Sequence, residues 1–241
     1  WDVLPDKKLP GGAPMNVAVH LKKLGKQVKF VSKVGTDDMG RELRRFLDSI
    51  EFQDYLLQED PEHTTGMVRV DLSDTNDPQY EIVFPSAWDF IELDDDMRKL
   101  ADQSDIIIYG SLTSRNRTSR ETLEYLLDNE KAFHVFDVNL REPHYLQERI
   151  EALLWKANLV KMNEAELDIM AGWFIEDPGE LSEEAIARSL GDKFDCPVIC
   201  VTKGEQGAAL LYKDYYYNHP GYSIELVDAV GSGDAFLAGL M

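Results

Sequence analysis

A turn of small residues near the carboxyl end of the chain carries the clearest chemistry. A strand-like run at 223–227 leads into this turn, which ends at Asp234, where a helical pattern begins. The small residues at 231–233 let the backbone approach a ligand closely, and the start of a helix suits an anion. A carboxylate at Asp234 would normally repel that anion. It is useful if it takes a proton from a hydroxyl that attacks a phosphate, so the pattern predicts phosphoryl transfer onto an alcohol.

Two glycines near the amino end form a second polar group with Asn16. Gly11 and Gly12 would let a sugar approach the backbone, and Asn16 offers a donor and an acceptor at a helix start. A plain helix cap explains Asn16 equally well.

Helical and strand-like patterns alternate along most of the chain. Helices are expected at 16–24, 40–49, 120–129, 149–156 and 182–190, and strands at 28–31, 106–110, 133–137, 159–162, 198–202 and 208–212. This alternation predicts one α/β domain over residues 1–241, with a mostly parallel central sheet and helices on both faces. Ligands of such sheets bind beyond the carboxyl ends of the strands. Asp137, Lys161, Thr202 and Asp228 are expected there, where they could line one crevice.

Residues 52–84 break the alternation. Strand-like pieces at 66–72 and 80–83 are joined by a turn at 73–78, with no helix between them. We interpret this segment as a small antiparallel β lid inserted into the domain. Such a lid would close over the crevice, because phosphoryl transfer must exclude water.

Composition restricts the class of protein. The 241 residues are 44% hydrophobic and carry a net charge of −20, which argues against nucleic acid and anionic membranes as partners. No apolar run or signal peptide suggests a membrane or secreted protein. Cys196 and Cys200 are expected as reduced thiols in the core of a cytoplasmic protein. Both ends of the sequence look truncated.

The two motifs resemble the signatures of one enzyme family. Residues 228–234, Asp-Ala-Val-Gly-Ser-Gly-Asp, resemble the second signature of the ribokinase-like (PfkB) carbohydrate kinases, usually Asp-Thr-x-Gly-Ala-Gly-Asp. Residues 11–18 resemble the first, Gly-Gly-x-x-x-Asn-x-Ala, in the Gly-Gly-Ala-Pro form of fructokinases. The resemblance implies the ribokinase-like fold. Ala229 replaces the usual Thr, which leaves a local hydroxyl hydrogen bond in doubt.

The resemblance also implies roles for individual residues. Asp234 would be the catalytic base, and the backbone of Gly231, Ser232 and Gly233 would form the anion hole. Sugar contacts would come from Asp2, Gly12, Asn16 and Arg141. Nucleotide contacts would come from Lys161, Asn163, Thr202, Gly204 and Asp228. Asn163 and Glu166 match the Asn-x-x-Glu motif of the family, so Glu166 would handle magnesium.

Alternative explanations without a functional role stay open for four of these residues. Arg141 is equally well explained by pairing with an acid on the acidic surface, and Lys161 by solvation. An ordinary β-turn accounts for Thr202 and Gly204.

The sequence therefore predicts an ATP-dependent sugar kinase that uses Mg²⁺, with fructose as the favoured acceptor. A sibling kinase for 2-keto-3-deoxygluconate, ribose or a nucleoside is an alternative, as is a binding protein without activity. A requirement for a monovalent cation and a homodimer formed through the lid stay open. Adenine contacts are expected from residues after Met241. The chain has no Gly-x-x-x-x-Gly-Lys-Ser/Thr loop, so it is not a P-loop enzyme.

Overall fold

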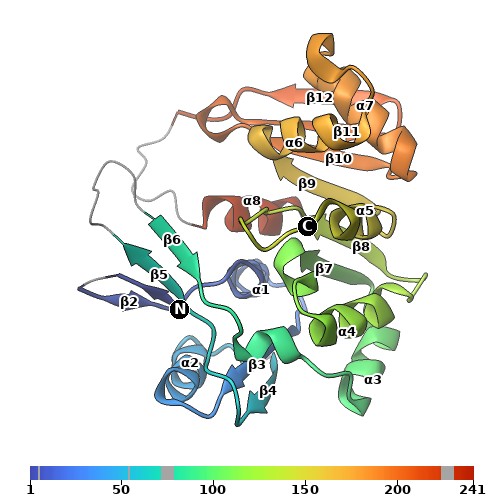
Figure 1. The fold of residues 1–241 in the computed structure, drawn as a ribbon. Helices are drawn as coiled ribbons and strands as arrows, with labels where there is room; N and C mark the ends of the chain where they lie inside the picture. Colours follow the sequence, from blue (N-terminus) through green and yellow to red (C-terminus); the bar gives the residue numbers. More distant parts are fainter. Residues whose placement is uncertain (5, 54, 72–78, 224–230) are drawn as a thin grey trace. The chain divides into compact units, whose positions relative to one another are not determined.

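A computed structural model describes residues 1–4, 6–53, 55–71, 79–223 and 231–241 of the chain (Figure 1). The described residues pack into two units. The first comprises Trp1–Met97, Asn116–Thr122 and Ala229–Met241, and the second comprises Arg98–Arg115 and Leu123–Asp228. The strand expected at 223–227 and the acid Asp228 fall almost wholly in 224–230, outside the described residues.

The second unit is built on one six-stranded sheet. Its strands are β7 (Ile106–Gly110), β8 (Phe133–Asp137), β9 (Leu159–Asn163), β10 (Val198–Thr202), β11 (Ala208–Tyr212) and β12 (Tyr215–His219). They lie in the order β12-β11-β10-β9-β8-β7. Strands β7 to β10 are parallel, while β11 and β12 extend the sheet as an antiparallel hairpin. The expected mostly parallel sheet is confirmed, including the hairpin partner at 208–212.

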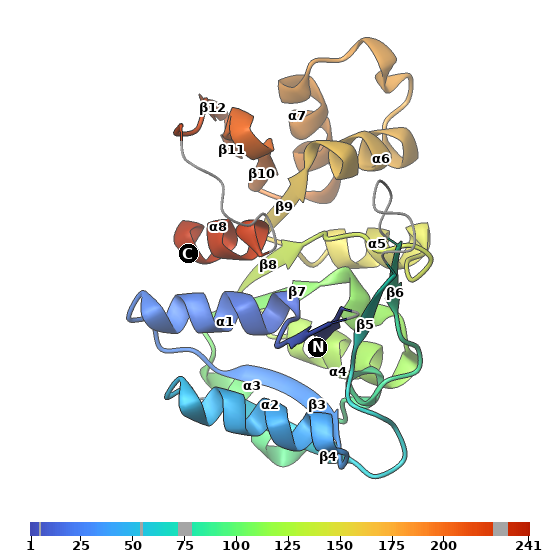
Figure 2. The ribbon, with the colours of Figure 1, turned by 90° about the vertical axis from the view of Figure 1, so that its left-hand side faces the viewer.

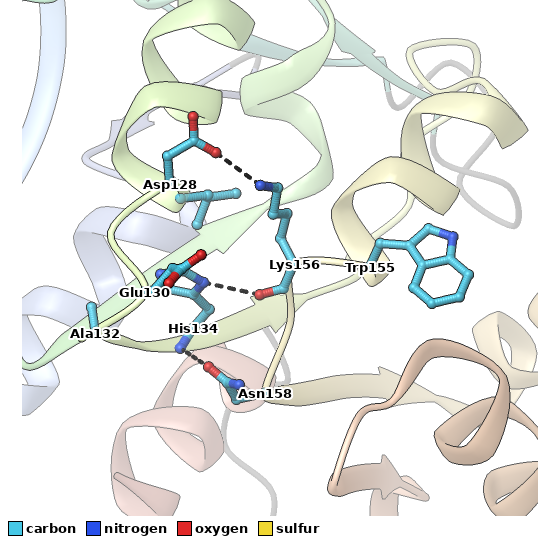
Figure 3. A pocket seen from close by; sticks show the side chains of 8 residues that line it. Asp128, Glu130, Ala132, His134, Trp155, Lys156 and Asn158 are labelled. Atoms are coloured by element: carbon cyan, nitrogen blue, oxygen red, sulfur yellow. Dashed lines mark hydrogen bonds and ion pairs between the residues drawn. The ribbon is translucent and has the colours of Figure 1, made fainter.

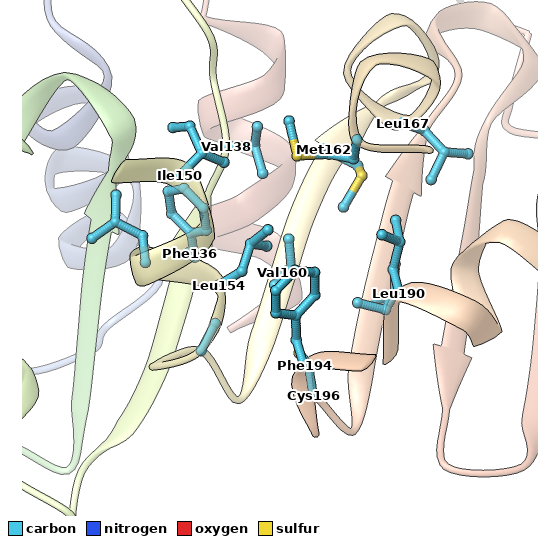
Figure 4. Packing of buried hydrophobic residues seen from close by; sticks show 14 of the residues in the cluster. Phe136, Val138, Ile150, Leu154, Val160, Met162, Leu167, Leu190, Phe194 and Cys196 are labelled. Atoms are coloured by element: carbon cyan, nitrogen blue, oxygen red, sulfur yellow. The ribbon is translucent and has the colours of Figure 1, made fainter. Parts of the chain in front are cut away.

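Helices alternate along the chain with the parallel strands of this sheet. They are α3 (Asp95–Gln103), α4 (Arg117–Leu127), α5 (Gln147–Leu154), α6 (Glu164–Phe174) and α7 (Glu183–Phe194), of which α3 and α4 are divided between the two units. Side chains from α4 to α7 pack with the strands in one hydrophobic core (Figure 4). Phe136, Val160 and Ile199 are buried in this core, one on each of three neighbouring strands. Such runs of apolar residues are typical of parallel strands that are covered by helices.

The first unit contains the two segments that carry the family signatures. Its elements are α1 (Ala13–Lys23), β3 (Phe30–Gly35), α2 (Asp38–Ser49), β4 (Tyr55–Asp60) and α8 (Ser232–Leu240). A second core, which includes Met15, Phe30, Leu47 and Phe52, holds α1, α2 and β3 together. Helices α1 and α8 lie side by side although they come from opposite ends of the sequence (Figures 1 and 2).

A small four-stranded sheet also belongs to the first unit. It consists of β1 (Asp2–Val3), β2 (Lys8–Leu9), β5 (Val68–Asp71) and β6 (Gln79–Ile82), in the order β2-β1-β5-β6. Strands β5 and β6 are the antiparallel pair expected within 52–84. Strand β4 lies in the same range but pairs in parallel with β3, so the small sheet takes up only the later part of that range. Strand β1 joins it in parallel with β5.

Short 3₁₀ helices and two buried thiols complete the described residues. The 3₁₀ helices are Ala87–Phe90, Ser111–Ser114, Pro178–Glu180 and Gly204–Gln206. Cys196 and Cys200 are buried and unoxidised, and burial raises the pKa of each thiol to about 11. They therefore pack as small apolar side chains. Across the described ranges, every helix is too short or too polar to span a bilayer.

The core of the second unit yields a stability test on one strand. Phe136 is 0% exposed, whereas Phe133 on the same strand is 38% exposed. Replacing Phe136 by Ala leaves a cavity, and we expect a loss of about 3–5 kcal/mol in the free energy of unfolding. Phe133→Ala is the matched control and should cost clearly less. Urea denaturation of both variants measures this difference, and equal losses would contradict the packing described here.

Candidate active site

The structure assembles the predicted residues into two groups, one in each unit. The group in the first unit centres on a hydrogen bond between the two signature segments. The Asn16 side-chain amide donates to Oδ2 of Asp234 over 2.8 Å, across 218 positions of sequence. Asn16 lies early in α1 and Asp234 early in α8, and both side chains are half-buried. This contact fixes the direction of one carboxylate oxygen of Asp234.

The turn before α8 lies beside that carboxylate. Gly231 precedes the helix and has a left-handed φ of 76°. A Cβ atom added at Gly231 would lie 3.6 Å from Nδ2 of Asn16 and 3.8 Å from Oδ2 of Asp234. The turn therefore passes directly beside the carboxylate. Ser232 and Gly233, the first residues of α8, follow this turn and contribute backbone N–H groups at the positive end of the helix dipole.

Asp2 lies against Gly11, which precedes α1. A Cβ atom added at Gly11 would overlap the Asp2 carboxylate, so only glycine allows this approach. Gly12 caps α1 with a φ of 122°, a conformation that favours glycine. Gly11 thus lets the Asp2 carboxylate approach the backbone that leads into α1. These contacts place Asp2, Gly12 and Asn16 on one continuous stretch of the first unit.

The group in the second unit lies at the carboxyl ends of neighbouring strands. Asp137 ends β8 and accepts a hydrogen bond from the Lys161 ammonium on β9, with 2.9 Å between the two atoms. Both side chains are buried. Burial raises the pKa of Asp137 above its ordinary value, and the Lys161 charge acts against this rise. Lys161 was predicted at a strand end with solvation as an alternative, and the structure shows it inside β9 in a buried ion pair.

Asn163 and Glu166 form a reciprocal cap at the start of α6. The Asn163 side chain accepts from the Glu166 N–H at 2.8 Å, and Glu166 Oε2 accepts from the Asn163 N–H at 2.9 Å. Glu166 Oε1 accepts from the Leu140 N–H at 2.8 Å. The Glu166 carboxylate therefore ties the loop after β8 to the end of β9. An Asn-x-x-Glu spacing is the sequence pattern of a capping box, so the reciprocal bonds of these two residues are predictable from the sequence.

The remaining predicted residues lie around this second group or outside it. Thr202 ends β10 beside Asn163, and its hydroxyl donates to the Met162 carbonyl at 3.3 Å. Gly204 follows with a φ of 54°. Arg141 is exposed, and its positive charge acts to lower the pKa of Asp137. Asp228 lies outside the described residues. The hydrogen bond from the Leu140 N–H to Glu166 is not predictable from the sequence, because almost every residue has a backbone N–H group and residue types do not show which one a carboxylate contacts.

Comparisons with known proteins identify the family of the chain. The model of the pfkB family of carbohydrate kinases matches residues 6–241. The chain is 30% identical to a fructokinase of Escherichia coli over 252 residues, which cover 100% of this chain and 80% of that protein. A solved structure of a Vibrio cholerae fructokinase double mutant, bound to fructose, ADP and potassium, has a TM-score of 0.81 and 28% identity. That match covers 99% of this chain and 78% of the other. An aminoimidazole riboside kinase from Salmonella enterica shares the fold, with a TM-score of 0.78, 24% identity and 99% and 80% coverage.

The fold and the two signatures define a carbohydrate kinase of the ribokinase-like fold. The chain belongs to the pfkB family of carbohydrate kinases. It is a phosphotransferase that acts on a sugar hydroxyl, so the alternative of a binding protein without activity is not supported.

The buried Glu166 carboxyl generates a prediction about pH. It is 6% exposed, and burial is the main cause that raises its pKa above the ordinary value of 4.5. The folded chain then binds this proton more tightly than the unfolded chain does. This contribution to stability is present below pH 4.5 and is lost as the pH rises through the raised pKa. Relative to Glu166→Gln, the wild-type chain should therefore lose free energy of unfolding as the pH rises from 4.5.

Urea denaturation between pH 4.5 and pH 7 measures this difference. Glu164→Gln is the matched control, because Glu164 lies in the same helical turn and is exposed. A difference between wild type and Glu166→Gln that stays constant with pH, or that changes in the opposite direction, would show that burial does not govern this carboxyl.

Proposed function

We propose that this chain is an ATP-dependent kinase that phosphorylates a primary hydroxyl of a free sugar, with fructose preferred. The observation that carries the proposal is the contact between Asn16 and Asp234 at the glycine turn before α8. It joins a carboxylate, an amide and a helix start, which are the parts that proton removal and anion binding need. Membership of the pfkB family supplies the reaction class.

Asp234 is the proposed general base. Its Oδ2 accepts the hydrogen bond from Asn16, and the other oxygen takes the proton from the sugar hydroxyl as that hydroxyl attacks the terminal phosphate. A carboxylate held by a hydrogen bond loses little freedom when the substrate arrives, which favours the transfer. Asn16 would thus position the base in addition to contacting the sugar.

The backbone around Gly231 is the proposed anion hole. The N–H groups at the start of α8 would stabilise the charge that develops on the transferred phosphoryl group, and the helix dipole would add to this stabilisation. The conformation of Gly231 supports this role, because its left-handed turn leads straight into those N–H groups. A larger residue at this position would be strained and would stand close to Asn16 and Asp234.

Asp2 and the small sheet are the proposed sugar side of the site. Asp2 lies on β1, which pairs with β5 of the small sheet. A closing movement of this sheet would therefore carry a sugar ligand with it, which is how a lid would couple sugar binding to the exclusion of water. The lid function itself is part of the proposal.

The second group would handle ATP and its metal. In the described part of the chain, His, Cys, Asp and Glu side chains form no cluster of three that could hold a metal. Mg²⁺ is commonly held by water, phosphates and one or two carboxylates. Each Glu166 oxygen accepts one backbone N–H and keeps a lone pair for water. Glu166 therefore fits a hydrated Mg²⁺, which would neutralise phosphate charge, while Lys161 and Thr202 would lie toward the phosphates.

The preference for fructose rests on similarity. The Gly-Gly-Ala-Pro sequence at 11–14 is the form that fructokinases carry. The Vibrio cholerae fructokinase that matches this chain was solved with fructose and ADP. A fold neighbour that phosphorylates a riboside shows that the same fold serves other acceptors. A kinase for 2-keto-3-deoxygluconate, ribose or a nucleoside is therefore the second candidate.

Loss of the base gives the first test of this proposal. Asp234→Asn keeps the shape of the side chain but cannot accept the proton, so kcat should fall by at least ~10²-fold. ADP release measured at saturating sugar and ATP gives kcat, and circular dichroism checks that the variant folds. A variant that keeps near-normal turnover would remove Asp234 from this role.

Asn16→Ala separates positioning from sugar binding in the same assay. If Asn16 holds the base, kcat falls in the wild-type background and changes little in the Asp234→Asn background, because the effect passes through Asp234. If Asn16 only contacts the sugar, KM rises by the same factor in both backgrounds.

A panel of acceptors tests the substrate. Fructose, ribose, 2-keto-3-deoxygluconate and adenosine are compared by kcat/KM in the same assay. Fructose should exceed each of the others by at least ~10-fold, because hydrogen bonds built for one pattern of hydroxyls are left unpaired by another. A higher value for another acceptor would assign the chain to a sibling kinase and leave the role of Asp234 intact.

A further inference from the structure

The loop that follows β10 is closed by hydrogen bonds of its own backbone. It covers residues 203–207, and the Lys203 N–H donates to the Gly207 carbonyl over 2.8 Å. Gly204 and Gly207 have φ angles of 54° and 86°, which favour glycine. The loop lies after the carboxyl end of a parallel strand, where ligands of such sheets bind. Thr202 and Gly204, the proposed nucleotide contacts, lie next to this loop and within it.

The Lys203 side chain ties this loop to α7 and β12. Only 10% of the side chain is exposed. Its ammonium donates to Glu183 at the start of α7 over 3.1 Å and to the side-chain oxygen of Asn218 on β12 over 2.8 Å. Because successive residues of a strand point to opposite faces of the sheet, Lys203 shares a face with Val201, which packs in one core with α7. Thr202 points to the other face.

Glu183 is the shared acceptor of these hydrogen bonds. Its Oε1 also accepts a short hydrogen bond from the Tyr216 hydroxyl on β12. Burial is the main cause that raises the pKa of Tyr216 above its ordinary value, so this hydroxyl keeps its proton and donates. The next acid along α7, Glu184, pairs with Arg188 over 2.7 Å. The Lys203 ammonium is therefore held by one particular carboxylate of this helical turn.

The backbone of the loop also rests on the end of the β11–β12 hairpin. A Cβ atom added at Gly207 would lie 2.0 Å from the His219 carbonyl oxygen and 2.3 Å from the Gly221 nitrogen. Glycine at position 207 is thus what allows this close approach. The hairpin strand that ends at His219 carries Asn218, which accepts from Lys203. Backbone packing and the Lys203 side chain therefore attach the loop to the same strand.

We propose that Lys203 is a positioning residue for the nucleotide, an inference that rests on the ATP site proposed above. Its ammonium, held by Glu183 and Asn218, fixes the loop so that Thr202 and Gly204 keep the conformation that ATP binds. Lys203 makes no phosphate contact of its own, because its charge is directed to the face that α7 covers. A loop that is ordered in advance loses less conformational entropy when a ligand binds, which raises the affinity.

Steady-state kinetics of Lys203→Met tests this role, because Met keeps the apolar stem and removes the ammonium. The KM for ATP should rise at least ~3-fold, as expected for lost hydrogen bonds, while kcat and the KM for the sugar change less than about 2-fold. Lys203→Arg keeps several N–H donors and should restore most of the affinity.

Lys156→Met is the matched control for the loss of a paired lysine. Lys156 also forms an ion pair, with Asp128 over 2.8 Å (Figure 3). It lies before β9, so it is at the opposite ends of the parallel strands from the loop. The KM for ATP should stay unchanged in this variant, and a rise equal to that of Lys203→Met would overturn the proposal.

Glu183→Ala separates positioning from simple attraction between a positive charge and ATP. If charge alone mattered, removal of an acid would lower the KM for ATP. If Glu183 holds Lys203, its removal raises the KM instead. Glu184→Ala removes the same charge one position along the helix and should not raise it. A lowered or unchanged KM in Glu183→Ala would overturn the proposal.

Hydrogen exchange of the chain without ATP reads the loop directly. The amides of Gln206 and Gly207 are bonded within the loop over 2.9 and 3.2 Å. They should exchange at least ~3-fold faster in Lys203→Met, with the amides of β9 unchanged. Equal rates in the two proteins would overturn the positioning role even if the KM for ATP rises, and would leave the proposed kinase activity intact. A wild-type chain that releases no ADP from ATP would contradict the proposed function, and this inference with it.

Discussion

The hydrogen bond between Asn16 and Asp234 is the constraint on which the rest of the first unit depends. It spans 218 positions of sequence and joins the first turns of α1 and α8. Both residues lie beside glycines whose positive φ angles shape the turns before their helices, at Gly12 and Gly231. Larger residues there would be strained, so the glycines and the amide together set the direction of the carboxylate. The proposed chemistry follows from that direction.

The second unit buries charged side chains near the ends of its strands. Asp137 is buried with Lys161 as its partner, and Glu166 is buried with two backbone N–H groups on its oxygens. Removal of one member of such a set leaves the others unsatisfied at a large cost. The same bonds fix the loop after β8 against the start of α6. Polar groups of the proposed phosphate side are thus held in place by the folding of the unit itself.

Local patterns made the parallel strands and the two signatures predictable, because each depends on a few neighbouring residues. In the structure, the parallel pairing of β8, β9 and β10 brings Asp137 opposite Lys161. The pairing of β4 with β3 was missed, because a short strand carries no sign of its partner. The contact between Asn16 and Asp234 and the bond from Leu140 to Glu166 were also beyond sequence reasoning. Both join distant segments, and only tertiary packing decides which distant groups meet.

A crystal structure of the chain with fructose and a non-hydrolysable ATP analogue tests the central claim most directly. The account predicts that the primary hydroxyl oxygen of the sugar lies within about 3 Å of the Asp234 carboxylate, the hydrogen-bond distance that proton transfer needs. It also predicts that Asn16 still donates to Oδ2. A sugar bound with its primary hydroxyl out of reach of Asp234, or with that carboxylate turned away from the Gly231 turn, would contradict the account.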